Sequence, residues 1–125
     1  MVSSFKELIV WKRAYELTLE VYSCSGHFPR SETFGLAAQM RRATISIVSN
    51  IAEGYGRGHR SEYIQFLRMA YASTGELETQ LMLSRDLEYL SEQKFQRVLS
   101  ILLEVQKMLG SMVRRFDLES RKRRE

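Results

Sequence analysis

Apolar residues recur at steps of three and four along almost the whole chain, and this periodicity is the feature that most restricts the fold. The cleanest run comprises Phe95, Val98, Leu99, Leu102, Val105, Leu109, Met112 and Phe116. Such steps place the side chains on one face of an α-helix, which has about 3.6 residues per turn. No segment alternates apolar and polar residues as a half-buried strand would. The sequence therefore predicts an all-α fold.

Three breaks divide this pattern into four helical segments. Pro29 cannot continue a helix, and Gly26 suits the left-handed residue that commonly ends one. Ser61 and Ser91, each followed by a glutamate, are the predicted N-caps of the third and fourth helices. Because the connections are short, we expect an antiparallel, up-down-up-down four-helix bundle, with its second helix beginning near Glu32.

Length and composition indicate one domain. The chain has 125 residues, of which 44% are apolar, and this is enough to bury a single core. We assign residues 1–117 to the bundle domain and residues 118–125 to a basic C-terminal tail. The single cysteine, Cys24, permits no internal disulfide, which fits a reducing compartment. We see neither a signal peptide nor a window of about 18 apolar residues, and we therefore expect a cytoplasmic protein without a membrane partner.

The net charge of +4 is concentrated near the C-terminus, where residues 112–125 hold six basic and three acidic residues. Four consecutive cations, Arg121, Lys122, Arg123 and Arg124, lie in the tail. Such a run can attract nucleic acid through its phosphates. The alternative is a solvated helix end with no partner.

The stretch from Asn50 to Arg60 holds three of the seven glycines and joins the second helix to the third. It follows a helix rather than a strand and lacks the Gly-Lys-Ser/Thr of a P-loop, so a helix-to-helix turn is favoured over a phosphate cradle. The turn nevertheless places Arg57, His59 and Arg60 beside a helix N-terminus, where they could meet a backbone phosphate. The pair Arg41 and Arg42 completes the candidate nucleic-acid-binding residues.

Asn50 and Glu53 are polar residues on the flank of an apolar helix face that is also rich in small residues. If they are partly buried they need partners, such as Arg41 or Arg42 of a neighbouring chain, because unpaired buried polar groups are costly. A network that fixes helix register is the favoured interpretation, and direct contact with a ligand is the alternative. Glu76 and Glu78 form an acidic patch that could join this structural or intersubunit network. We expect the small-residue helix to be the most tightly packed of the four. We also expect a close helix contact at Ala70, Ser73 and Gly75 on the next helix.

No arrangement of residues indicates catalysis. His27 and His59 lie in different loops without a Cys or Glu at metal-ligand spacing, and no Glu-x-x-His pair suggests a di-metal bundle. Cys24 lies on an apolar helical stripe, which indicates a buried structural thiol rather than a nucleophile. We therefore expect a non-enzymatic protein with no catalytic residues, no metal and no cofactor.

Two runs, Asn50-Ile51-Ala52-Glu53-Gly54-Tyr55-Gly56-Arg57 and Glu76-Leu77-Glu78-Thr79-Gln80-Leu81, together with Gln39-Met40-Arg41-Arg42-Ala43, resemble the four helix bundle protein family. This family is also called the 23S rRNA intervening-sequence protein family. The resemblance runs from about Phe5 to Phe116 and implies a homopentamer of antiparallel bundles. Members are encoded in intervening sequences of bacterial 23S rRNA genes. The family is similar in fold to the accessory variability determinant of diversity-generating retroelements, a basic pentamer that works with a reverse transcriptase and nucleic acid.

Two functional hypotheses follow from the residues and the resemblance. The first is an oligomeric protein that binds the RNA or DNA backbone, or acts as an accessory factor, through the arginine pair, the Gly-rich turn and the tail. The second is a protein-interaction scaffold, such as a partner of a retroelement reverse transcriptase, in which the basic residues serve assembly or remain solvated.

Overall fold

The computed structural model describes residues 3–124, with side chains described for residues 3–123. All regular structure in these residues is helical, which confirms the predicted all-α class. Two short 3-10 helices, Phe5–Glu7 and Arg30–Glu32, precede the first two long helices. The long helices are α1 (Ile9–Ser25), α2 (Leu36–Gly56), α3 (Arg60–Asp86) and α4 (Glu92–Arg124).

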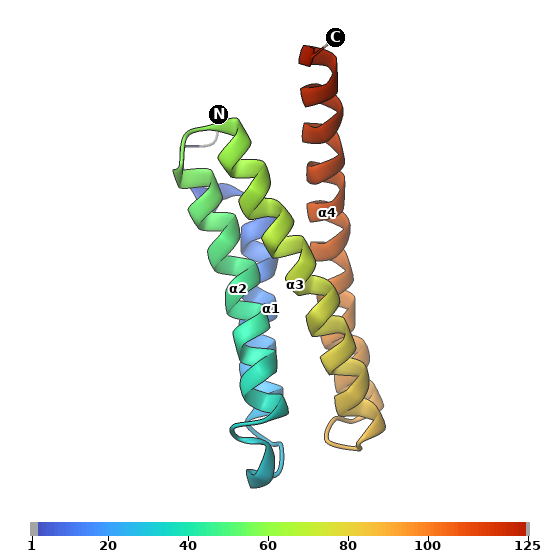
Figure 1. Cartoon of the computed structure of the whole chain (residues 1–125). Coiled ribbons are helices and arrows are strands. Elements are labelled where there is room, and N and C mark those ends of the chain that lie inside the picture. The colour runs from blue at the N-terminus through green and yellow to red at the C-terminus, as the bar shows by residue number, and fades with distance from the viewer. Residues whose placement is uncertain (1–2, 125) are drawn as a thin grey trace.

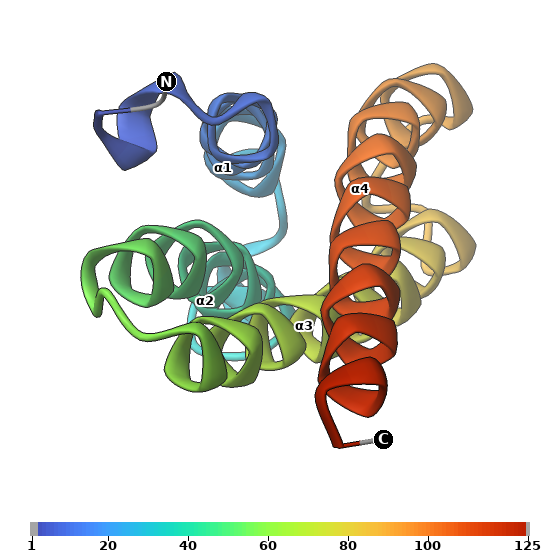
Figure 2. The same ribbon diagram turned by 90° about the horizontal axis from the view of Figure 1, so that it is seen from above.

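The four helices pack side by side around one core (Figures 1 and 2). α1 and α3 each contact both α2 and α4, so the helices close a ring. Each helix contributes fully buried aliphatic side chains, for example Leu17, Ile47, Leu77 and Leu102. Burying one such side chain contributes about 1.5–3 kcal/mol. A four-helix bundle is therefore present.

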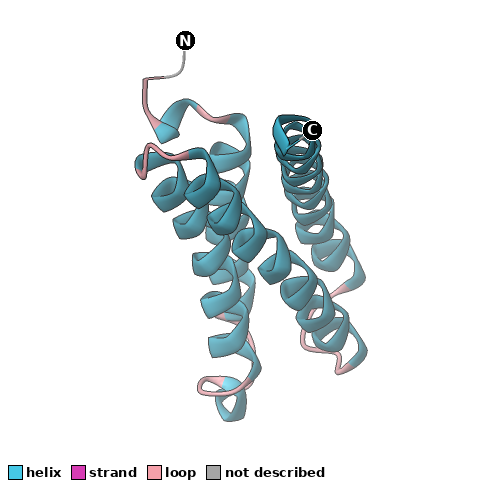
Figure 3. Ribbon diagram, turned by 45° about the horizontal axis from the view of Figure 1, so that its top comes forward, coloured by secondary structure: helices cyan, strands magenta, loops and turns pink. Residues whose placement is uncertain are grey.

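The connections lie at the two ends of the bundle. In Figure 1 the α2–α3 turn at residues 57–59 lies at the top, which we call the upper end, and the α1–α2 and α3–α4 connections lie at the bottom. α4 is the longest helix at 33 residues, and its last turns extend beyond the upper ends of α2 and α3 (Figures 1 and 3). None of the helices in residues 3–124 combines the length and the apolar content needed to cross a lipid bilayer.

α2 and α3 approach closely near the upper end because Gly54 carries no side chain. A Cβ atom built on Gly54 would lie 2.6 Å from Cβ of Phe66, far inside van der Waals contact. Further down the same pair, the hydroxyls of Ser46 and Ser73 share a hydrogen bond of 2.9 Å. The predicted tight packing of the small-residue helix is therefore confirmed here. The predicted close contact at Gly75 is wrong, since a Cβ there would meet nothing within 4 Å.

The start of α3 and the end of α1 differ from the sequence-based expectations. α3 begins at Arg60 with His59 as its N-cap, so Ser61 lies inside the helix instead of capping it. Gly26 has a φ of −65° and ends α1 in the right-handed region, which corrects the predicted left-handed residue. Among the described residues the positive φ angles belong to Glu88, at 65°, and Gly58, at 77°. Ser91 is confirmed as a cap, because its Oγ accepts a 3.2 Å hydrogen bond from the amide of Lys94.

α2 begins at Leu36, later than predicted, because the residues before it form a short 3-10 helix and a loop, held by the side chain of Glu32. Oε1 of Glu32 accepts a 3.0 Å hydrogen bond from the amide of Leu36, and Oε2 accepts one of 3.0 Å from the hydroxyl of Tyr89. Tyr89 also packs against Phe28, with ring centroids 5.5 Å apart. These contacts tie the α1–α2 loop to the α3–α4 turn at the lower end.

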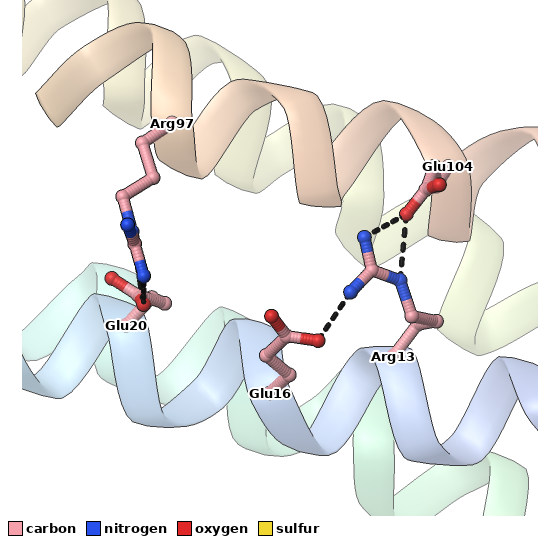
Figure 4. Close-up of polar contacts among 5 residues, drawn as sticks. All are labelled: Arg13, Glu16, Glu20, Arg97 and Glu104. Atoms are coloured by element: carbon pink, nitrogen blue, oxygen red, sulfur yellow. Dashed lines mark hydrogen bonds and ion pairs between the residues drawn. The ribbon is translucent and has the colours of Figure 1, made fainter. Parts of the chain in front are cut away.

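Ion pairs along the seam between α1 and α4 fix these two helices relative to each other (Figure 4). Nε of Arg13 donates a 2.6 Å hydrogen bond to Glu104, and the same guanidinium also pairs with Glu16. Arg97 of α4 pairs with Glu20 of α1 at 2.9 Å. The hydrogen bond to Glu104 raises the pKa of Arg13. Because these side chains are solvent-accessible, each pair contributes little to stability.

Candidate nucleic-acid interface

The candidate cations fall at two separate places on the bundle. Arg57, His59 and Arg60 lie at the upper end, where α2 ends and α3 begins. Arg41 and Arg42 lie in the lower half of α2 (Figure 1). With a rise of about 1.5 Å per residue, the fifteen positions from Arg42 to Arg57 span roughly 22 Å along the helix. The candidate cations that the sequence grouped together therefore lie on two distinct surfaces.

At the upper end the structure brings the Gly-rich turn and the C-terminal tail together. A pocket of about 290 Å³ is lined by His59, Arg60, Ser61, Ile64, Phe116, Ser120 and Arg123. Three of these are basic residues that the sequence identified in two segments more than sixty positions apart. We call this the basic pocket.

Arg60 is the residue on which the basic pocket is centred. Its guanidinium lies over the ring of Phe116, 4.8 Å from the centroid, and pairs with Glu119 of α4. Its Nε is buried and has no hydrogen-bond partner among the described residues. A guanidinium offers five N–H donors, so the pairing with Glu119 leaves donors for a further anion.

A second pocket adjoins the basic pocket and is aromatic in character. It measures about 280 Å³ and is lined by Gly54, Tyr55, Gly58, His59, Arg60, Tyr63 and Phe116. Three aromatic rings contribute to it. The centroid of the Tyr63 ring lies 6.0 Å from that of Tyr55 and 5.6 Å from that of Phe116. Burial raises the pKa of Tyr63. We call this the aromatic pocket.

The tail continues α4 and carries its cations into solvent. Arg121, Lys122 and Arg123 are exposed, and none of them joins an ion pair among the described residues. Arg124 ends the helix, and its side chain lies outside the described part of the chain. The helix runs without interruption across the predicted boundary between residues 117 and 118, which stays a prediction.

The two acidic residues described at this helical end, Asp117 and Glu119, are already neutralised within the chain. Asp117 pairs with Arg68 and Glu119 pairs with Arg60, both of which belong to α3. Two exposed arginines that the sequence analysis did not select, Arg114 and Arg115, join the tail cations on α4. They precede Arg121 and Lys122 by seven residues, or two helical turns, so the four share one face. That spacing is the signal that could have identified them.

Arg57 and Arg41 are engaged in contacts within the chain. Arg57 pairs with Glu53 one turn earlier on α2, at 2.8 Å, and lies over the ring of Phe66. Arg41 donates a 2.8 Å hydrogen bond from Nε to Oγ of Ser25 and lies 4.8 Å from the ring centroid of Tyr22. Arg41 therefore holds the end of α1 against α2.

Arg42 is exposed and joins no ion pair among the described residues. Of the pair Arg41 and Arg42, therefore, only Arg42 directs its charge to solvent.

The four residues of the predicted polar network have partners in the same chain. Asn50 donates from Nδ2 to the carbonyl oxygen of Ser46, at 2.8 Å, and Ser46 in turn bonds to Ser73 of α3. Glu53 pairs with Arg57. Glu76 accepts a 3.2 Å hydrogen bond from Gln80, and Glu78 accepts one of 3.2 Å from Gln106 of α4. Glu78 therefore acts in a contact between α3 and α4, whereas Asn50 bonds within α2 to Ser46, and a role between subunits stays a prediction.

In the described part of the chain, the remaining His, Cys, Asp and Glu side chains form no metal site and no nucleophilic site. There, no three His, Cys, Asp or Glu side chains lie close enough together to hold a metal ion. Cys24 is 5% exposed, and burial raises the pKa of its thiol. A neutral, buried thiol is a poor nucleophile.

Comparison with known proteins relates the chain to a family and to a solved fold. A family model described as 23S rRNA-intervening sequence protein matches residues 6–111. No curated protein sequence matches the chain. The crystal structure of a protein of unknown function from the S23 ribosomal protein family of Bacteroides thetaiotaomicron superimposes with a TM-score of 0.78. The two are 23% identical, and the match covers 84% of this chain and 98% of the other. At that identity the likeness shows the fold.

Proposed function

The chain belongs to the 23S rRNA-intervening sequence protein family, and from this premise we propose that it is a non-enzymatic, oligomeric protein that binds the phosphate backbone of RNA or DNA. The observation that carries the proposal is the meeting of His59, Arg60 and Arg123 around the basic pocket. Basic residues from two distant segments converge there, beside a helical end whose acidic residues are already paired. Arg123, like Arg121 and Lys122 beside it, joins no ion pair among the described residues, and such cations favour nucleic acid electrostatically.

A second cationic surface lies on the same helix. Arg114, Arg115, Arg121 and Lys122 share one exposed face of α4, roughly opposite the face that lines the basic pocket. Phosphate contacts of this kind position a backbone without reading its sequence. We therefore propose binding that depends on charge and shape more than on base identity.

We further propose that the bundle is antiparallel and assembles as a homopentamer, as the family resemblance implies. Support comes from apolar side chains that the bundle leaves outside. On α1, Tyr15 is 50% exposed, Leu19 is 59% exposed and Tyr22 is 42% exposed. They follow one another at steps of four and three, so they form a stripe on the face of α1 away from the core. Such a stripe suits burial against another subunit.

Salt-dependent binding tests the proposal. Fluorescence anisotropy with a labelled RNA, repeated over a series of salt concentrations, should give an affinity that falls steeply with salt, because neutralised phosphates release counterions. The triple change Arg121→Gln, Lys122→Gln and Arg123→Gln should flatten the slope of log K against log salt. The slope should decrease by roughly 0.7–0.9 for each phosphate that the variant no longer neutralises.

A matched control removes the same charge elsewhere. Lys12, Arg30 and Lys94 are exposed cations that line neither pocket at the upper end. Their triple change to Gln should leave the salt slope close to that of the unaltered protein. An affinity that does not change with salt, or an equal loss in both triple variants, would contradict the proposal.

A protein-interaction scaffold, for example a reverse-transcriptase partner, is the second candidate. The large apolar side chains left exposed on α1 favour it, because they could serve a protein partner. The double variant Arg57→Ala and Arg60→Ala discriminates between the two functions. Loss of RNA binding with assembly intact supports the first, and loss of assembly supports the scaffold.

A further inference from the structure

We propose that the aromatic and basic pockets at the upper end together bind one unpaired nucleotide of a single-stranded nucleic acid, with its base in the aromatic pocket and its phosphate in the basic pocket. The inference rests on the proposed function and specifies which part of the nucleic acid is bound. It starts from the fact that the two pockets share His59, Arg60 and Phe116 as lining residues. An aromatic pocket that adjoins a basic pocket matches a nucleotide, which carries a base and a phosphate.

The aromatic pocket has the composition that a base requires. Tyr55, Tyr63 and Phe116 supply three rings from three different helices, and Tyr63 bridges the other two through tilted or edge-on contacts. Gly54 and Gly58 add backbone without side chains to the wall of the same pocket. Every nucleobase presents a π-face, so such a site stacks bases with little regard to sequence.

The basic pocket has the composition that a phosphate requires. His59, Arg60 and Arg123 provide positive charge or N–H donors, and Ser61 and Ser120 provide hydroxyls. The buried Nε of Arg60 lacks a hydrogen-bond partner among the described residues, while Glu119 and the Phe116 ring hold the guanidinium in place. A planar guanidinium held in this way is suited to phosphate oxygens.

The size and the adjacency of the pockets favour an unpaired nucleotide over a duplex. The pockets measure about 290 and 280 Å³, each near the lower end of the range of about 300–1,000 Å³ for small-molecule sites. A base inside a helix is covered by its stacked neighbours, so it enters such a pocket only after leaving the stack. Single strands and loops offer their bases without that cost.

The test compares an unstructured oligouridylate with a blunt RNA duplex of the same length, at one salt concentration. The unaltered protein should bind the single strand more tightly. The change Tyr55→Leu should weaken binding of the oligouridylate by roughly 5- to 150-fold, which corresponds to removal of one base–aromatic stack. It should leave binding of the duplex unchanged. Tyr71→Leu, on an exposed tyrosine of α3 that lines neither pocket, is the matched control and should alter neither.

The outcomes separate this inference from the proposed function. If neither probe binds, the proposed function fails. If both bind equally, and Tyr55→Leu changes neither or both alike, the inference is overturned while backbone binding stands. A photo-crosslink from a 4-thiouridine oligonucleotide to the unaltered protein does not depend on any variant folding. Crosslinks to peptides that contain Tyr55, Tyr63 or Phe116 support the inference, and crosslinks confined to other peptides contradict it.

Discussion

Gly54 sets the distance between α2 and α3 at the upper end, and its effect is local and steric. A Cβ atom at residue 54 would lie only 2.6 Å from Cβ of Phe66 and 3.1 Å from Cδ1 of Tyr63. Tyr63 and Gly54 itself line the aromatic pocket, so the packing of this one residue affects the candidate site directly. The sequence showed a glycine on an apolar face, but the close neighbour could not be identified without the fold.

The change Gly54→Ala should therefore lower the free energy of unfolding by about 1–3 kcal/mol, the usual cost of overpacking a filled interior. Gly75→Ala is the matched control, since a Cβ there meets nothing within 4 Å and alanine is the better helix former. It should raise stability by about 0.5–1 kcal/mol. Urea unfolding followed by circular dichroism measures both, and a stabilised Gly54→Ala protein would show that the close approach is not as described.

Cys24 gives a chemical test of burial at the residue scale. Because burial raises the pKa of the thiol and leaves it 5% exposed, little thiolate is accessible in the folded protein. Labelling with a disulfide reagent at neutral pH should be slow in buffer and fast in denaturing urea. Rapid labelling of the folded protein would contradict a structural role for this thiol.

Helix ends were the part of the fold that the sequence located least accurately. Ser91 and Ser61 have the same local pattern, a serine followed by a glutamate and a helical run. Only Ser91 caps a helix, because α3 starts one residue before Ser61. In the turn before α3, Gly58 has a φ of 77° and His59 takes the extended geometry of an N-cap. Local sequence does not determine which of two adjacent residues takes that role.

The two serines should consequently respond differently to alanine. Ser91→Ala should destabilise the protein by about 0.5–2 kcal/mol, because the amide of Lys94 loses its side-chain acceptor. Ser61→Ala should be neutral or slightly stabilising, since alanine favours helix interiors. Thermal unfolding of both variants checks this, and an equal loss at the two positions would refute the assigned start of α3.

At the scale of the whole molecule, the sequence predicted the parts of the candidate site but not their arrangement. Periodicity predicted the helices, and charge indicated His59, Arg60 and Arg123 as separate candidates. That these three surround one pocket depends on how far α4 extends past α3, which no local pattern encodes. For the same reason Arg41 was grouped with them, although its guanidinium holds α1 and α2 together at the other end.

Assembly is the last property that depends on the whole molecule. The stripe formed by Tyr15, Leu19 and Tyr22 lies on α1, whose opposite face is fully engaged in the core. Leu19 is 59% exposed in the single chain, and burying it between subunits would stabilise an oligomer. Native mass spectrometry should find a pentamer for the unaltered protein. Leu19→Glu should give smaller species with unchanged helix content, because it places a charge in the contact without touching the core.

Leu87→Glu serves as the control for assembly. Leu87 is 50% exposed and follows the end of α3, away from the stripe. This variant should remain pentameric, since a charge there meets only solvent. A monomeric unaltered protein, or a Leu19→Glu variant that stays pentameric, would place the subunit contact elsewhere or remove it.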